Sequence, residues 1–118
     1  HGFTRRGSSV ASGLYQRQKY LEPMNHSKLP KSMAAVCREF GVDQDTVLTK
    51  SKRKSIKEPR QLFYLICDIN GISASYIQDW VEKNGGVKQT SSTIIHGRKR
   101  AMLLMEEDPD LRVFVENL

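Results

Sequence analysis

The segment 59–71, PRQLFYLICDING, decides the fold. Its apolar side chains recur at the spacing of one helix face: Leu62, Leu65, Ile66 and Ile69. Pro59 is favoured at the first position of a helix, and Asn70-Gly71 is a left-handed turn signal that ends one. The pattern therefore predicts a helix of about a dozen residues between these two signals.

The segments before it show the same period. From Ser32 onward, a one-face stripe predicts a helix that stops at Gly41: Met33, Val36, Cys37 and Phe40. Asp43 can cap a short second helix that contains Val47 and Leu48. A basic segment then leads to Pro59.

Further helices are predicted after the Asn70-Gly71 turn. Ser75 and Gln78 have the spacing of a capping box, which predicts a helix that ends at Asn84-Gly85-Gly86. Its apolar stripe is Tyr76, Ile77, Trp80 and Val81. The next helix begins near Thr90, runs to about Glu107 and turns these residues inward: Ile94, Ile95, Ala101, Met102 and Met105. In the last helix, Asp108 is the cap, Pro109 follows, and the apolar face is Leu111, Phe114, Val115 and Leu118.

Strand signals are nearly absent, so the predicted fold class is all-α, a compact bundle of about six helices. Residues 27–118 form this domain. Residues 1–26 lack sustained apolar periodicity, and we expect them to be a flexible basic N-terminal tail or linker.

The charge is unevenly distributed. The 118 residues contain 19 Lys+Arg and 13 Asp+Glu, a net charge of +6. One cationic cluster stands against Glu58 alone: Lys50, Lys52, Arg53, Lys54, Lys57 and Arg60. A second one is Lys88, Arg98, Lys99 and Arg100, whereas the C-terminal stretch is acidic. Two basic clusters favour a phosphate backbone as partner, although a solvated surface is the plainer alternative.

No catalytic or cofactor motif is present. The sequence has no glycine-rich phosphate loop, and its histidines and its two cysteines do not have metal-ligand spacing. Cys37 and Cys67 lie in apolar helical patterns, which indicates reduced thiols. We therefore expect no cofactor, no metal and no enzymatic activity. No export signal or membrane span is visible, so we expect a cytoplasmic protein.

The segment from Ser75 to Arg100 has the layout of a helix-turn-helix. The second helix starts with short polar side chains, Thr90, Ser91, Ser92 and Thr93, which permit close approach to base edges in a major groove. Arg98, Lys99 and Arg100 follow where backbone phosphates would pass. The alternative is that Thr90 and its neighbours simply cap the helix.

Two segments of the chain resemble a known family. The segment 46–61, TVLTKSKRKSIKEPRQ, is followed by a leucine-rich helix and then by 92–96, STIIH. Together they are similar to the C-terminal DNA-binding domain of the bacterial replication initiator DnaA, over about residues 33–118. The resemblance implies a Trp-repressor-like helical fold, initiator-type binding to double-stranded DNA, and a nucleoid-associated protein of bacterial, phage or plasmid origin. The family's ATPase module is expected to be absent, because its phosphate-loop motif is not in the sequence.

The resemblance also implies residue roles. Lys52 takes the place of the basic-loop arginine that enters the minor groove, and Arg60 and Gln61 would hold phosphates. Ser92 and Thr93 match the threonines that read bases, and His96 matches the histidine that ends the motif. The complete candidate interface is Lys50, Lys52, Arg53, Lys54, Arg60, Gln61, Lys88, Gln89, Thr90, Ser91, Ser92, Thr93, His96, Arg98, Lys99 and Arg100.

Two departures from the family bear on the target. Thr90 and Ser91 stand where the family has Asp-His, and the turn before them is longer, through Gly85, Gly86, Val87 and Lys88. We expect a monomer linked to replication initiation or its regulation, with other replication proteins as further partners. The alternative is a protein-interaction module or transcriptional regulator on the same scaffold, using the acidic C-terminal face or the Trp80 side.

Overall fold

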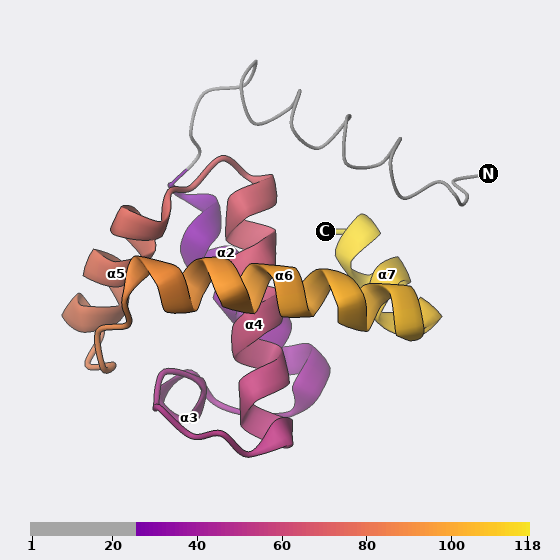
Figure 1. Cartoon of the computed structure of the whole chain (residues 1–118), viewed down its shortest axis with the longest axis horizontal. Coiled ribbons are helices and arrows are strands. Elements are labelled where there is room, and N and C mark those ends of the chain that lie inside the picture. Colours follow the sequence, from indigo (N-terminus) through magenta and orange to yellow (C-terminus); the bar gives the residue numbers. More distant parts are fainter. Residues whose placement is uncertain (1–25) are drawn as a thin grey trace.

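Helix α4 (Lys54–Ile69) is the centre of the fold, and the other helices pack around it (Figure 1). The structure is a computed structural model that describes residues 26–118. Within them it has no strand, and the other five helices are α2 (Lys28–Phe40), α3 (Gln44–Val47), α5 (Ala74–Lys83), α6 (Ser91–Glu107) and α7 (Pro109–Glu116). The predicted all-α bundle is confirmed, while the expected tail lies outside the described residues, apart from His26.

The composition of α4 explains its central position. Every residue from Leu62 to Asp68 is buried, so this stretch contacts neighbours on all sides of the helix. A helix that is apolar all round belongs inside a fold. Each fully buried large side chain, such as Phe63, stabilises the fold by about 1.5–3 kcal/mol.

α4 begins at Lys54, earlier than Pro59, where we expected its start. Pro59 is buried inside the helix. Its missing N–H leaves the carbonyl of Ser55 without a helical partner, but Ser55 is exposed, so water can satisfy that acceptor. The basic segment is therefore divided: Lys54 and Lys57 lie on the helix, and only the residues before them form a loop.

Of the caps predicted for α5 and α7, one is wrong and one is confirmed. Ser73, and not Ser75, caps α5, because Ser73 Oγ accepts the Tyr76 N–H at 3.2 Å. At α7 the carboxylate of Asp108 accepts the Asp110 N–H at 3.0 Å, and the helix starts at the following proline as predicted.

α6 crosses α4 on a narrow stripe (Figure 1). Its buried residues are Ile94, Gly97 and Ala101. A Cβ at Gly97 would lie only 2.9 Å from Tyr64 Cδ2, so the missing side chain lets the two helices approach closely. Ile95 and Met102, which we expected to be inward, are 44% and 37% exposed because they lie beside this stripe.

More apolar surface remains than the sequence suggested. Tyr76 and Leu118, both predicted core residues, are exposed, and the Tyr76 ring stacks on His26 with centroids 3.7 Å apart. Leu103 on α6 is exposed too. We expected a monomer because no exposed apolar surface was predicted. Since such surface is present, the monomer stays a prediction without this argument.

Candidate nucleic-acid interface

The basic loop, defined here as Thr49–Arg53, connects α3 to α4 and alternates hydroxyl residues with cations. The loop hydroxyls form local hydrogen bonds. Thr49 Oγ1 donates to the Thr46 carbonyl of α3 at 2.8 Å and accepts the Ser51 N–H at 3.3 Å. Ser51 Oγ accepts the Arg53 N–H at 3.2 Å. Lys50, Lys52 and Arg53 are exposed between them. The local fold thus presents the cations to solvent.

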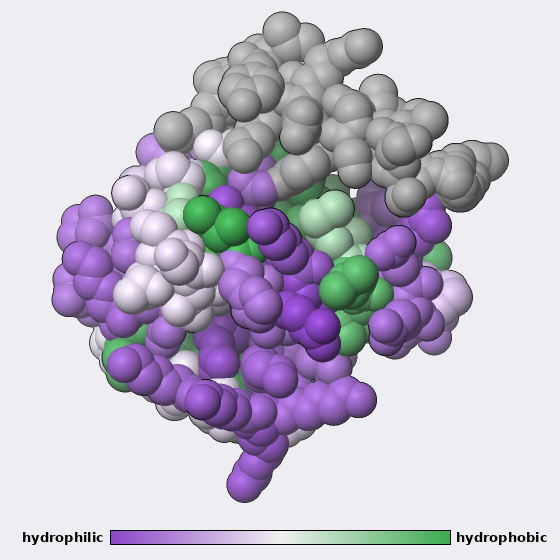
Figure 2. All heavy atoms as spheres, viewed as in Figure 1, coloured by the Kyte–Doolittle hydropathy of each residue, from purple (hydrophilic) through white to green (hydrophobic). Residues whose placement is uncertain are grey.

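Hydrophilic side chains cover this end of the molecule. Figure 2 shows them over the lower part of the view, where Figure 1 places α3 and the start of α4. Lys54 belongs to this surface, with its side chain 83% exposed and its Nζ 3.9 Å from Glu58 Oε2. The first turn of α4 has no acidic residue, so its positive dipole end adds to the positive field there.

Arg60 on α4 binds the backbone of the basic loop. Its guanidinium donates to the carbonyls of Thr49 at 2.7 Å and Ser51 at 2.8 Å, with a longer contact to Val47 at 3.4 Å. Burial lowers the pKa of Arg60, but an arginine remains charged at neutral pH. Arg60 therefore positions the loop through these carbonyls, and its predicted phosphate contact stays a prediction.

Gln61 occupies a different place from the loop cations. It is half-buried at the crossing of α4 and α6, where its Cγ would lie 3.4 Å from a Cβ at Gly97. Gln61 thus lies beside the helix that carries the other candidate residues.

The start of α6 is polar and capped. Thr90 Oγ1 accepts the Thr93 N–H at 3.1 Å, and the two hydroxyls bond each other at 2.9 Å. Ser91, Ser92 and Thr93 are all exposed. The capping interpretation of Thr90 is confirmed, and Ser92 and the Thr93 methyl remain available at the surface.

Gln78 joins α5 to the start of α6, a role that the sequence did not reveal. Its Nε2 donates to the Gln89 carbonyl at 2.7 Å, and its Oε1 accepts from Ser91 Oγ at 3.3 Å. The only sequence signal at Gln78 was its spacing from Ser75, which suggested a cap instead. Gln89 itself is half-buried.

Arg98 does not belong to the exposed surface, contrary to the prediction. Its side chain is 12% exposed, and its Nη1 lies 3.2 Å from Asp68 Oδ1 on α4. It also donates to the carbonyls of Tyr64 (3.4 Å) and Ile72 (3.2 Å). Arg98 therefore links α6 to α4 by an ion pair and a hydrogen bond. Burial raises the pKa of Asp68, and the Arg98 charge opposes that shift.

The remaining predicted cations of the second cluster are exposed. Lys88 lies in the turn before α6, and Lys99 and Arg100 lie on α6 with His96. One acidic cluster lies at the other end of α6 and on α7, which Figure 1 places away from α3: Glu106, Glu107, Asp108, Asp110 and Glu116. The two ends of α6 thus differ in charge.

A close contact joins the basic loop to the turn before α6. Gly86 packs against Leu48, the last residue before the loop: a Cβ at Gly86 would lie 2.8 Å from Leu48 Cβ. The Val87 N–H donates to the Leu48 carbonyl at 3.3 Å. The structure therefore places the start of the basic loop against the turn before α6, although Leu48 and Gly86 are far apart in the sequence.

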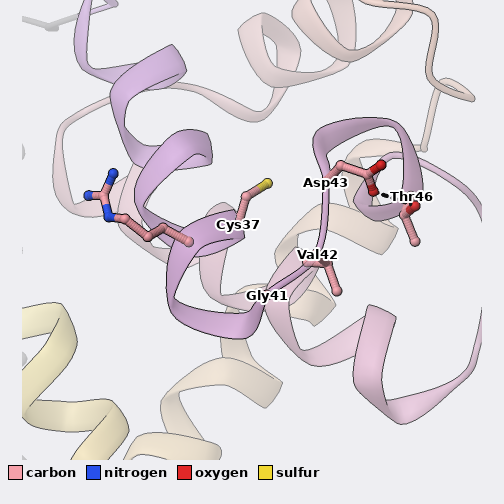
Figure 3. Close-up of a pocket in the computed structure, with 6 residues that line it drawn as sticks. Cys37, Gly41, Val42, Asp43 and Thr46 are labelled. Carbon is pink, nitrogen blue, oxygen red and sulfur yellow. Dashed lines mark hydrogen bonds between the residues drawn. The ribbon is translucent and has the colours of Figure 1, made fainter.

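A shallow hollow between α2 and α3 lies apart from these residues (Figure 3). It is lined by Cys37, Val42, Asp43 and Thr46, among others, and Thr46 Oγ1 donates to Asp43 Oδ1 at 2.8 Å. Burial and the Asp43 charge raise the pKa of Cys37, so the thiol is protonated at neutral pH. Cys37 is thus no activated nucleophile.

Residues 26–118 contain no group of three or more His, Cys, Asp or Glu side chains placed to hold a metal ion. No helix in this part of the chain is long and apolar enough to cross a bilayer. The two cysteines, Cys37 and Cys67, are free thiols, as predicted.

No model of a known protein family matches the sequence. A search of the solved structures gives no significant match either.

Proposed function

We propose that this chain binds double-stranded DNA with sequence specificity, using the basic loop and the N-terminal half of α6 together. The observation that carries the proposal is the contact of Gly86 and Val87 with Leu48, which couples the two elements. Polyanion binding by one element alone would not need that coupling. Reading a sequence in a duplex requires both positioning on phosphates and contact with base edges.

α6 supplies the base contacts in this proposal. A recognition helix enters the major groove by its first turns, and the small exposed side chains of Ser91, Ser92 and Thr93 let it come close. The Ser92 hydroxyl can donate to or accept from a base edge, and the Thr93 methyl can touch a thymine methyl. Lys99 and Arg100 follow on the same helix, at a distance suited to phosphates.

The basic loop supplies the sequence-independent part. Lys50, Lys52 and Arg53 project from a loop that Arg60 holds in shape, so little order has to be gained on binding. In this proposal Lys52 enters the minor groove and its neighbours contact phosphates. The acidic end around α7 would face away, since phosphates repel it.

The wider role follows from the resemblance to the replication initiator. We propose that the chain occupies initiator-type sites and acts in replication initiation or its regulation. This role requires that the chain prefer initiator-type sites over other duplexes.

The test separates the two kinds of contact. We expect Lys52→Ala to weaken binding to every duplex and to lower the salt dependence by about one unit of slope. We expect Ser92→Ala to narrow the gap between target and random duplexes by about 1–3 kcal/mol, with an unchanged slope. Both are measured by fluorescence anisotropy of a labelled duplex at several salt concentrations.

Lys31→Ala is the matched control. Lys31 is exposed on α2 and lies beside Ile69 and Asn70, at the end of α4 opposite to the basic loop. Its removal takes away the same charge and should leave the slope unchanged. Equal effects of Lys31→Ala and Lys52→Ala would mean that only net charge matters, which contradicts a built interface.

One observation favours the second candidate function, a protein-interaction module. Ile95, Met102 and Leu103 expose apolar surface on α6. The Trp80 side, which the sequence suggested for this role, is less open, because Trp80 is half-buried and packs on Phe63 with ring centroids 5.8 Å apart. If a protein partner is still captured in a pull-down after the charges of the basic loop are reversed, this result would support the interaction module over DNA binding.

A further inference from the structure

The turn between α5 and α6 is anchored at both ends while its middle is presented to solvent. The Gly86 N–H donates to the Val81 carbonyl at 2.9 Å, and the Gln89 carbonyl accepts from Gln78 Nε2 at 2.7 Å. Between these anchors Val87 is 44% exposed and Lys88 is exposed. An apolar and a cationic residue thus follow each other at the surface.

The turn lies directly against the start of the basic loop. A Cβ at Gly86 would lie 2.7 Å from Val81 Cγ1 and 2.8 Å from Leu48 Cβ, so only glycine fits between these two neighbours. Two neighbouring carbonyls accept hydrogen bonds here. The Leu48 carbonyl accepts from the Val87 N–H, and the Thr49 carbonyl accepts from the Arg60 guanidinium. The turn therefore bridges the loop and α6.

This placement has a consequence on a DNA duplex. In B-form DNA, a phosphodiester strand separates each minor groove from the neighbouring major groove. If the basic loop follows the minor groove and α6 enters the major groove, the element between them meets that strand. Lys88 adds a positive charge there, and Val87 adds a small apolar surface.

We propose that the turn Val87–Gln89 is a third DNA-contacting element, which grips the phosphodiester strand between the two grooves. The Lys88 ammonium pairs with a phosphate of this strand, and Val87 packs against a deoxyribose. Gly86 and Gln78 are positioning residues that set the turn on Leu48 and on α6. This inference rests on the proposed function, because it assumes that the loop and α6 bind the same duplex.

The first test is the salt dependence of Lys88→Ala, with Lys31→Ala as control. The probe is a duplex obtained by random-sequence selection against the wild-type chain. One lost phosphate contact removes about 0.9 units of slope, so the fall in affinity between about 50 and 200 mM salt should be about 3.5-fold smaller for Lys88→Ala. Lys31→Ala should keep the wild-type slope.

The second test locates the phosphate. Single phosphates of the selected duplex are replaced by neutral methylphosphonates, one at a time along each strand. For the wild-type chain, we expect affinity to fall at a position between the segment read in the major groove and the segment covered in the minor groove. For Lys88→Ala, this position should lose its effect while the other sensitive positions keep theirs.

Val87→Ser and Gly86→Ala complete the set. Val87→Ser should weaken binding at an unchanged salt slope, because it removes an apolar contact and no charge. Gly86→Ala should weaken binding more than either, since the turn must move off Leu48. If Gly86→Ala does not fold, the exposed positions Lys88 and Val87 still decide the matter.

The outcomes separate this inference from the proposed function. If the wild-type chain binds no duplex at low salt and selection enriches nothing, the proposed function itself is wrong. If the wild-type chain binds DNA but Lys88→Ala keeps both its slope and its methylphosphonate profile, the turn makes no phosphate contact and only this inference is overturned.

Discussion

Replacing Arg60 by lysine tests whether this residue positions the basic loop or contacts DNA itself. Lysine keeps the positive charge but cannot donate to two separated carbonyls in the fixed geometry of a guanidinium. In the structure these acceptors are the carbonyls of Thr49 and Ser51, at 2.7 and 2.8 Å. Arg60→Lys therefore loosens the loop without changing the charge of the interface.

The expected size follows from the hydrogen bonds. A bond from a charged donor contributes about 1.5–3 kcal/mol, and one such bond is lost on a side chain that is only half-buried, so we expect about 1–2 kcal/mol. If the loosened loop has to become ordered when it binds DNA, this cost of about 1–2 kcal/mol lowers the DNA affinity by about 5- to 30-fold. The salt slope should not change.

The assay combines urea unfolding with fluorescence anisotropy of a labelled duplex at several salt concentrations. Arg38→Lys is the matched control, because Arg38 is exposed on α2 and undergoes the same chemical change. Wild-type affinity and stability of Arg60→Lys would refute the positioning role. Wild-type affinity of Arg60→Lys together with a slope lowered by about one unit in Arg60→Ala would instead identify a phosphate contact.

Three further predictions concern how α6 is held on α4. Arg98→Ala should destabilise the fold by about 3–5 kcal/mol in urea unfolding, because it leaves the buried Asp68 carboxylate without its cation. Burial raises the pKa of Asp68 in the folded state, so its contribution to stability is present below its ordinary pKa of 3.8 and is lost as the pH rises through the raised value. The stability of Asp68→Asn relative to wild type should therefore increase with pH over this range. A stability difference that stays constant in pH-dependent unfolding would contradict this prediction. Gly97→Ala should cost about 1–3 kcal/mol in thermal or urea unfolding, because its Cβ would meet Tyr64 at 2.9 Å.

Most helices could be predicted from sequence because periodicity and capping are local signals. The apolar stripe of Met33, Val36 and Cys37, and the Asp108 cap before Pro109, indicate their helices without any tertiary information. Pro59 misled the prediction for the same reason. Its preference for a helix start is local, whereas in the folded chain α4 begins at Lys54 and Pro59 is buried inside the helix.

Burial on α6 could be predicted only in part. Ile94 and Ala101 are buried as expected, but Ile95 and Met102 are not. The width of a buried stripe depends on how closely the neighbouring helix approaches. That distance is set by the contact of Gly97 with Tyr64, which brings together residues from two different helices.

The candidate site shows a similar limit. Sequence indicates that a segment is cationic, and it cannot tell which cations meet carbonyls and carboxylates inside the fold. Lys50, Lys52 and Lys88 are exposed, whereas Arg60 and Arg98 serve as internal donors. Arginine is the residue suited to that internal role, because its planar fork can satisfy several buried acceptors at once.

The contact between the basic loop and the turn before α6 also gives no signal in the sequence. The pair Gly85-Gly86 was a turn signal, but only the folded chain shows that Gly86 packs on Leu48. A glycine required by a neighbour distant in sequence gives no local pattern that differs from a glycine required by a turn.

The measurement that tests the central claim most directly is the anisotropy of two labelled duplexes at two salt concentrations. One carries an initiator-type box, and the other has the same composition in scrambled order. We predict tighter binding to the box, with an affinity for both duplexes that falls as salt rises. The absence of binding to either duplex at low salt would contradict the claim that the basic loop and α6 form a DNA interface.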